Sequence, residues 1–228
     1  PWIQYEAGSS VSEPFGKDAA DRARKVMGFV AHSPEIRDLS AEFEPLTALV
    51  ASLIGGDDLD MFQDMALLKP SLGGREKPWH QDAAYFNLGE HARVVGCWIA
   101  LDEATPKNGC MIFQRGGHTR GELPHFNVSA QCPPIPRISS ARRPASFPQV
   151  RDYQLCDTDA PKGADVLACP LPPGGLVLFD SKIPHGTATN ASPAPRNALQ
   201  FHWALKSTAQ VVPADAPAIG RIARFGGA

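Results

Sequence analysis

The sequence predicts a mainly β fold, an antiparallel sandwich or barrel, with helices at its N-terminal end. From Asp60 onward the apolar runs are short and separated by Gly, Pro and Asn clusters, whereas residues 1–60 carry helical periodicities. The 228 residues, 43% of them hydrophobic, suffice for one well-cored domain and fall short of two. We therefore expect a single domain over 1–228, with a helical buttress at 1–60, a β core at 61–121 and 164–206, and an irregular lid insertion at 122–163.

Two N-terminal segments carry the helical signals. Lys17 to Val30 is rich in Ala, Arg and Lys, and Ser40 precedes a second segment in which it can serve as the N-cap. Gly55 suits the end of this second helix. The apolar stripe of the second segment consists of Phe43, Leu46, Val50, Leu53 and Ile54. We expect both helices to buttress a sheet.

The strand candidates are five short apolar runs. They are Met61 to Leu68, Val94 to Leu101, Cys110 to Gln114, Leu176 to Phe179 and Ala198 to Leu205. Turn-forming clusters between such runs are typical of an antiparallel sandwich or barrel.

An irregular stretch from Leu123 to Arg151 interrupts this pattern. It contains many prolines and no acidic residue, and proline excludes it from a central strand. Its arginines are Arg137, Arg142, Arg143 and Arg151. Two interpretations stay open, a solvated surface loop and a lid over an active site. As a lid, the stretch would favour an anionic substrate through its arginines.

Charge and composition restrict the partners. The formal net charge of -2 lacks the basic excess of a dedicated nucleic-acid binder, and no apolar run is long enough to span a membrane. We therefore expect a small-molecule partner. The five cysteines show no CxxC pairing, which favours a reducing, intracellular and cytoplasmic location. The sequence begins without Met and without a signal-peptide pattern, so we expect a processed or truncated chain.

Three residues form a candidate metal site. His80 and Asp82 are separated by one residue, and in an extended strand residues i and i+2 point to the same face. His185, which follows a later apolar run, can supply a third ligand. Two histidines and one carboxylate make the facial triad that leaves open positions on Fe(II). The HxD pair alone would be weak, because this spacing arises often by chance.

Arg196 strengthens the hypothesis. It lies eleven residues beyond His185, where a guanidinium could clamp the distal carboxylate of a keto acid; the alternative is a surface salt bridge. If the last strand alternates regularly, Gln200 and His202 share the face of Arg196, so that His202 could approach the pocket. The remaining histidines in polar surroundings are expected to be exposed, namely His32, His91 and His125.

Several blocks around these residues occur in a characteristic order. They are Met65-Ala66-Leu67-Leu68-Lys69-Pro70, Trp79 to Phe86, Gly96 to Asp102, Asn108-Gly109-Cys110-Met111, and Pro184-His185-Gly186-Thr187 followed by Arg196. From about Lys25 to Leu205 the chain resembles the phytanoyl-CoA hydroxylase (phytanoyl-CoA dioxygenase) family of 2-oxoglutarate-dependent oxygenases. The stretch that ends in His118 departs from the corresponding family motif at Arg115 and Gly117.

The resemblance implies a fold, a cofactor set and an activity. The fold is a cupin-like jelly roll, or double-stranded β-helix. The cofactors are Fe(II), 2-oxoglutarate and O2, with ascorbate as a reductant, and the iron ligands are His80, Asp82 and His185. The reaction hydroxylates or otherwise oxidises a C–H bond of a small molecule and converts 2-oxoglutarate to succinate and CO2. The implied cosubstrate contacts are Arg196, Thr187, Trp98, Met65 and Lys25.

Three alternatives stay open at this stage. A halogenase would carry a small residue in place of the carboxylate ligand, and Asp82 argues against it. A cupin-like isomerase or metal hydrolase would use the same ligands without redox chemistry. A non-catalytic ligand-binding jelly roll would keep the sheet alone. Neither the substrate, for which a coenzyme A thioester is one candidate, nor the oligomeric state is specified by the sequence.

Overall fold

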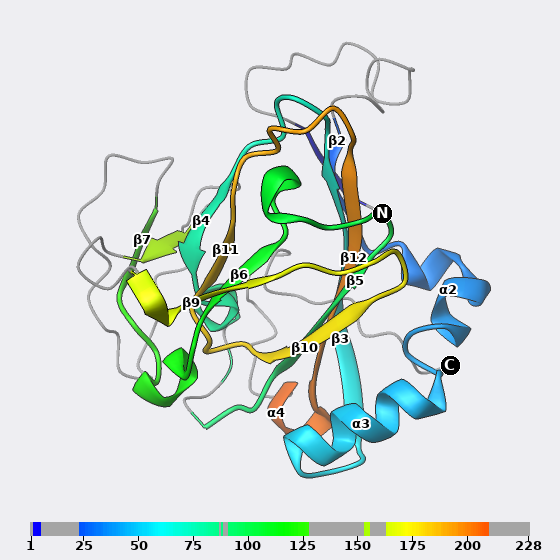
Figure 1. Cartoon of the computed structure of the whole chain (residues 1–228). Helices are drawn as coiled ribbons and strands as arrows, with labels where there is room; N and C mark the ends of the chain where they lie inside the picture. Colours follow the sequence, from blue (N-terminus) through cyan, green and yellow to red (C-terminus); the bar gives the residue numbers. More distant parts are fainter. Residues whose placement is uncertain are drawn as a thin grey trace.

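The computed structural model describes residues 2–5, 23–86, 88, 91–127, 153–155 and 163–209. In this part of the chain two antiparallel sheets pack face to face, as Figure 1 shows. The larger sheet has the order β1 (Trp2–Tyr5), β2 (Ala23–Met27), β3 (Leu59–Lys69), β12 (Arg196–Leu205), β5 (Val95–Ala100), β10 (Leu176–Asp180). The smaller sheet has the order β4 (Lys77–His80), β11 (His185–Thr187), β6 (Met111–Gln114), β9 (Val166–Cys169). The architecture confirms the predicted antiparallel sandwich.

The remaining elements are short. A two-stranded sheet joins β7 (His125–Asn127) to β8 (Tyr153–Leu155). The helices are α2 (Pro34–Asp38), α3 (Glu44–Ile54), α4 (Lys206–Ala209), and the 3-10 turns η1 (Val30–His32), η2 (Asp82–Tyr85), η3 (Pro106–Asn108), η4 (Gly117–Arg120) and η5 (Gly163–Asp165). Among the described residues, none of these helices has the length and apolarity needed to cross a bilayer.

Apolar side chains fill both faces of the larger sheet. Between the sheets, Trp98 and Ala198 pack with Met111 and Phe113 of the smaller sheet. On the opposite face, the α3 residues Leu46, Val50 and Ile54 cover Cys97, Phe201 and Trp203. Figure 1 shows α2 and α3 on this outer side. The larger sheet is therefore buried on both sides, which fixes its register because a one-residue slip would exchange the two faces.

The first predicted helix is wrong where the structure describes it. Residues 23–27 form the strand β2, in which Lys25 pairs with Leu67 of β3, while residues 17–22 lie outside the described part. Pairing with β3 satisfies the backbone groups of this segment, and such long-range pairing overrides local helix propensity. Gly28, at a φ of 70°, ends the strand.

The second predicted helix is confirmed, but it begins later than expected. Ser40 does not cap it, since its hydroxyl donates to the carbonyl of Ile36. The helix begins at Glu44, so Pro45 occupies the first turn. A start at Ser40 would have placed Pro45 where a helical N–H is required. The helix ends at Gly55, which has a φ of 87°, as predicted.

The lid hypothesis stays a prediction. Most of 122–163 lies outside the described residues, which include only 122–127, 153–155 and 163. The five strand candidates are all confirmed, with bounds shifted by one or two residues.

Asp64 ties the N-terminal segment to the outer face of the larger sheet. Its two carboxylate oxygens accept hydrogen bonds from the backbone N–H groups of Gly28 at 2.6 Å and Val30 at 2.7 Å. Only 3% of Asp64 is exposed. Hydrogen bonds to a charged, buried acceptor are among the stronger ones in proteins, so this carboxylate fixes the start of η1 on β3.

We expect Asp64→Asn to lower the free energy of unfolding by about 1–3 kcal/mol, because the amide keeps only one acceptor and no charge. Denaturant unfolding measures the change. The exposed Asp57 offers a matched control, since Asp57→Asn removes a charge without a buried partner. Equal midpoints for both variants would contradict the role given to Asp64.

Candidate metal centre

Three side chains converge between the two sheets. His80 is the last residue of β4, His185 is the first residue of β11, and the two are direct cross-strand partners. Asp82 is the first residue of η2. All three are buried, and each offers a ligand atom within 4.8 Å of the other two. The sequence prediction of this cluster is therefore matched by the geometry.

One detail of that prediction is wrong. The strand ends at His80, so Asp82 does not lie on it. Gln81 nevertheless keeps an extended backbone, with φ −111° and ψ 134°, and His80 and Asp82 still point to the same side. The rule for residues i and i+2 therefore holds across the strand end.

Both histidine rings are oriented by backbone carbonyls. The Nδ1 atom of His80 lies 2.8 Å from the carbonyl oxygen of Pro78, and the Nδ1 atom of His185 lies 3.0 Å from that of Ile183. A carbonyl only accepts, so each Nδ1 carries the proton. This leaves the Nε2 lone pair of each ring directed at Asp82, at 3.4 Å and 3.7 Å from its Oδ1. Such carbonyl contacts are the usual way in which ligating histidines are fixed.

Burial and the neighbouring side chains together set the protonation states of the three groups. Burial, with the neighbouring His185, lowers the pKa of His80 to about 3. Burial also lowers the pKa of His185. The pKa of Asp82 is held well below its usual value by His185, His202 and His80, against the opposing effect of burial. At neutral pH the site therefore consists of two neutral imidazoles and one carboxylate.

These protonation states make a cation the matching ligand. The Nε2 lone pairs of the two histidines and the Oδ1 atom of Asp82 face one another. The ring protons do not lie between them, because each Nδ1–H donates to a backbone carbonyl. Three converging electron-pair donors repel one another unless a positive ion lies between them. Imidazole and carboxylate ligands in a two-to-one ratio suit divalent iron.

The second oxygen of Asp82 is held from the larger sheet. Its Oδ2 atom lies 2.8 Å from Nε2 of His202 and accepts a hydrogen bond from the Gln200 side-chain amide at 3.0 Å. His202 is fully buried, and the rings of Phe62, Phe86 and Phe179 surround it. The sequence expectation that His202 approaches the pocket is confirmed, and Gln200 is a further contact on the same face.

The strand register decides which side chains face this cluster. Directly opposed residues of neighbouring antiparallel strands share a face. On β12 this face carries Arg196, Ala198, Gln200 and His202. Met65 of β3 and Trp98 of β5 are the two cross-strand partners of Gln200, and Lys69 of β3 is the partner of Arg196. Lys25 of β2 is the partner of Leu67, which in turn pairs with Ala198, so Lys25 lies on the same face. On the smaller sheet, Thr187 lies two residues beyond His185 on the same strand face. All five predicted cosubstrate contacts thus lie on the two facing surfaces, and their contacts to a cosubstrate stay a prediction.

Arg196 is buried without a partner for two of its nitrogens. It is 3% exposed, and neither Nε nor Nη1 has a hydrogen-bond partner among the described residues. Its guanidinium carbon lies 5.2 Å from the ring centre of Trp98, within the range of a cation–π contact. Burial lowers the pKa of Arg196 to about 10, so the side chain stays charged at neutral pH. A surface salt bridge, the alternative considered for this residue, is ruled out by its burial.

A second polar network, which the sequence did not indicate, supports Asp82 from the other side. Gln81 is 1% exposed; its amide nitrogen donates to the carbonyls of Gly121 and Lys182, and its amide oxygen accepts from the N–H of Leu123. The backbone N–H of Gln81 donates to Nε2 of His125 at 2.9 Å. His125 is 6% exposed, so the expectation that it is exposed was wrong, whereas His32 and His91 are exposed as expected.

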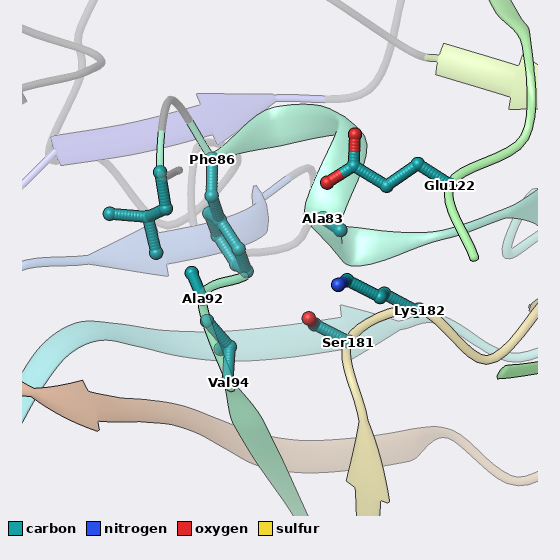
Figure 2. Close-up of a pocket in the computed structure, with 8 residues that line it drawn as sticks. Ala83, Phe86, Ala92, Val94, Glu122, Ser181 and Lys182 are labelled. Atoms are coloured by element: carbon teal, nitrogen blue, oxygen red, sulfur yellow. The ribbon is translucent and has the colours of Figure 1, made fainter. Parts of the chain in front are cut away.

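A hollow beside η2 is too small for a substrate. Figure 2 shows it between η2 and the turn at Ser181 and Lys182, with Phe86 and Val94 on one side and Glu122 at the rim. Its volume of about 10 Å³ has room for roughly one water molecule. None of the three candidate ligands lines it. His118 is exposed and lies outside the cluster.

A jelly-roll sandwich with two histidines and one aspartate converging between its sheets is the arrangement typical of non-haem iron oxygenases. The chain belongs to the phytanoyl-CoA dioxygenase (PhyH) family, whose family model matches residues 4–198. The family expected from the ordered sequence blocks is confirmed.

Two relatives illustrate the range of the family. Phytanoyl-CoA dioxygenase domain-containing protein 1 of Mus musculus is 35% identical over 175 residues, which cover 75% of this chain and 53% of that protein. Ectoine dioxygenase of Sphingopyxis alaskensis is 25% identical over 210 residues, which cover 86% of this chain and 64% of that protein. The chain spans about half the length of the curated relatives it matches first.

Solved structures agree with the fold. The crystal structure of EvdO2 from Micromonospora carbonacea var. aurantiaca complexed with 2-oxoglutarate has a TM-score of 0.61 and 27% identity, over 79% of this chain and 66% of that one. EctD from S. alaskensis with bound Fe has a TM-score of 0.59 and 22% identity, over 89% of this chain and 63% of that one. These likenesses confirm the jelly-roll fold.

We expect His202→Leu to weaken binding of a divalent metal by about 10- to 100-fold, because Asp82 loses a hydrogen bond to its Oδ2 atom. His202→Gln, which can still donate, should lose less. Metal titration of the purified variants measures both effects, with the exposed His32→Leu as the control. A dissociation constant unchanged in His202→Leu would show that Gln200 alone suffices to hold Asp82.

We expect the metal-free protein to lose stability as the pH falls below about 6.5. His80 and His185 have lowered pKa values in the folded state, so the unfolded chain binds more protons below this pH. Their contribution is complete above pH 6.5 and declines toward pH 3, where His80 itself titrates. Melting temperatures across this range measure the decline, which should be smaller in His80→Gln. A rise in melting temperature on acidification would mean that the folded state holds charged imidazoles.

Proposed function

We propose that this chain binds Fe(II) through His80, Asp82 and His185, binds 2-oxoglutarate, and hydroxylates a C–H bond of a small molecule. The observation that carries the proposal is the pairing of two features on facing sheets. One is the convergence of three electron-pair donors, and the other is the buried guanidinium of Arg196, whose Nε and Nη1 atoms have no hydrogen-bond partner among the described residues. A cation site and an anion site on facing sheets suit a keto acid that chelates a metal at one end and carries a carboxylate at the other.

Each group would have a distinct task. The metal, when bound, supplies oxidising chemistry that no side chain of the chain can provide. The two imidazoles and Asp82 hold it, and the carbonyls behind the rings keep the ring orientation fixed. Arg196 would bind the distal carboxylate of 2-oxoglutarate, and Trp98 would fix the plane of the guanidinium.

Aromatic rings would keep water out of the site. The ring of Phe179 lies 5.0 Å from that of His185, and the ring of Phe113 lies 5.9 Å from it. Tyr85 packs edge-on against His80 at 5.8 Å. Aromatic rings packed against both histidines would strengthen the electrostatic contacts within the site and limit side reactions with solvent.

The side chains at Tyr85 favour an anionic substrate. The ammonium group of Lys77 donates to the hydroxyl of Tyr85 at 2.6 Å and lies 4.9 Å from its ring centre. Lys77 also lowers the pKa of both His80 and His185, although burial is the largest cause for each, so its charge acts on the cluster. A negatively charged substrate group near Tyr85 would meet this charge.

The name of one relative is consistent with a small polar substrate. Ectoine dioxygenase of S. alaskensis aligns with 86% of this chain, and its name gives a small molecule as its substrate. The part of the chain expected to select the substrate, Leu123 to Arg151, is almost entirely outside the described residues. The proposal therefore extends to the reaction class and not to a named substrate.

The proposal is tested with protein loaded anaerobically with Fe(II) and then titrated with 2-oxoglutarate. We expect a visible charge-transfer absorbance from the chelate, and after admission of O2 we expect succinate in an amount that depends on O2. Asp82→Ala should abolish the absorbance because it removes the only anionic ligand. The exposed His118→Ala is the matched control and should keep it.

The same experiment separates the rival functions. A cupin-like isomerase or hydrolase would form no succinate on addition of O2. A non-catalytic binding jelly roll would keep its ligand in Asp82→Ala and show no turnover. A well-folded wild-type protein without the absorbance would contradict the proposal itself.

A further inference from the structure

We propose that Lys69 is a second cation of the cosubstrate site, which makes Thr187 a hydrogen-bond donor and selects a keto acid with a distal carboxylate. This inference rests on the proposed function and adds a positioning residue to it. Lys69 is the last residue of β3 and lies in the block Met65-Ala66-Leu67-Leu68-Lys69-Pro70.

The charges of Lys69 and Arg196 favour an anion site between these two side chains. Lys69 and Arg196 are direct cross-strand partners, so their side chains leave the larger sheet on the same face. Lys69 is 6% exposed and Arg196 is 3% exposed. Two buried cations on one face attract an anion. The Nε and Nη1 atoms of Arg196, which have no hydrogen-bond partner among the described residues, are available to bind it.

The hydrogen bond between Lys69 and Thr187 has a fixed direction. The ammonium group of Lys69 lies 3.0 Å from Oγ1 of Thr187 and can only donate. The Thr187 hydroxyl is therefore the acceptor in this contact, and its own proton must point elsewhere. Among the described residues no hydrogen bond donated by this hydroxyl is seen. The Thr187 hydroxyl can therefore donate its proton to an anionic ligand.

The ammonium group of Lys69 is held in place by its surroundings. Its ammonium group also donates to the carbonyl oxygen of Ala188. On the far side lies Gly109, whose φ is 82°, and a Cβ atom added there would come within 3.0 Å of the Lys69 nitrogen. Asn108 fixes this turn by a reciprocal capping box with Thr105. The turn at Asn108 and Gly109 therefore leaves room for the Lys69 ammonium group and confines it, which reduces the entropy lost when an anion binds.

These contacts give the two cations different roles. Arg196 offers a fork of donors that can bind both oxygens of one carboxylate. Lys69 contributes charge and, through Thr187, one oriented donor. Both act on the distal end of the cosubstrate and neither is a candidate metal ligand. Removing Lys69 should therefore reduce discrimination between keto acids that differ only at that end.

The test compares two ligands in anaerobic, Fe(II)-loaded protein. 2-Oxoglutarate carries the distal carboxylate, and 2-oxopentanoate has a methyl group in its place. Titration of the charge-transfer absorbance gives a dissociation constant for each without turnover. Lys69→Met should raise the dissociation constant of 2-oxoglutarate by about 10- to 100-fold and that of 2-oxopentanoate by less than about twofold. The exposed Lys107, in the neighbouring turn, provides the control Lys107→Met.

A second variant tests the coupling through the hydroxyl. Thr187→Val should also weaken 2-oxoglutarate binding. The double variant, Lys69→Met with Thr187→Val, should lose less binding free energy than the sum of the two single losses, because both changes act through one contact. The dissociation constant of Fe(II) should be unchanged in Lys69→Met.

The outcomes are distinct. Equal weakening of both ligands, or additive losses in the double variant, would overturn the role of Lys69 and make it a structural residue. A wild-type protein that binds Fe(II) but no keto acid would overturn the proposed function and this inference together.

Discussion

The pairing of β12 with β3 on one side and β5 on the other is the constraint on which the site depends. This strand alternates regularly from Arg196 to His202, so that every second side chain faces the smaller sheet. An irregularity follows only after His202, where β3 carries one extra residue, Phe62, whose ring packs beside His202. A shift of the ladder by one residue would turn the arginine and the supports of Asp82 toward α3 and destroy both ends of the site at once.

The pairing of β12 also sets where the polar and charged side chains of the site lie along this strand. The metal-facing oxygen of Asp82 lies among lone pairs from the smaller sheet, while its other oxygen is held by donors from the larger one. Positive charge gathers at the opposite end of β12, around Arg196. A jelly roll thus separates a site for a cation from a site for an anion by the length of a few residues along one strand. Aromatic side chains pack against His80, His185 and His202 at one end and against Arg196 at the other, and a low dielectric strengthens the electrostatic contacts of both groups.

The sequence predicted those features that depend on local spacing. His80 and Asp82 share a side because of two-residue periodicity, and the sequence spacing of His185 and Arg196 reflects the connection between β11 and β12, which are consecutive in the chain but lie in different sheets. What it could not predict depends on pairing between distant segments. Residues 23–27 have helical propensity and become a strand only because the edge of β3 is open to them. His125 appeared exposed because its partner, the backbone of Gln81, lies 44 residues away. The missed start at Glu44 had a local signal, Pro45.

The contacts at Oδ2 of Asp82 bear on how many positions a bound ion would keep. With this oxygen occupied by His202 and Gln200, the carboxylate would offer a metal only its Oδ1 atom. A carboxylate that used both oxygens would occupy one more coordination position of the ion. The two donors from β12 would therefore keep that position available for a small-molecule ligand.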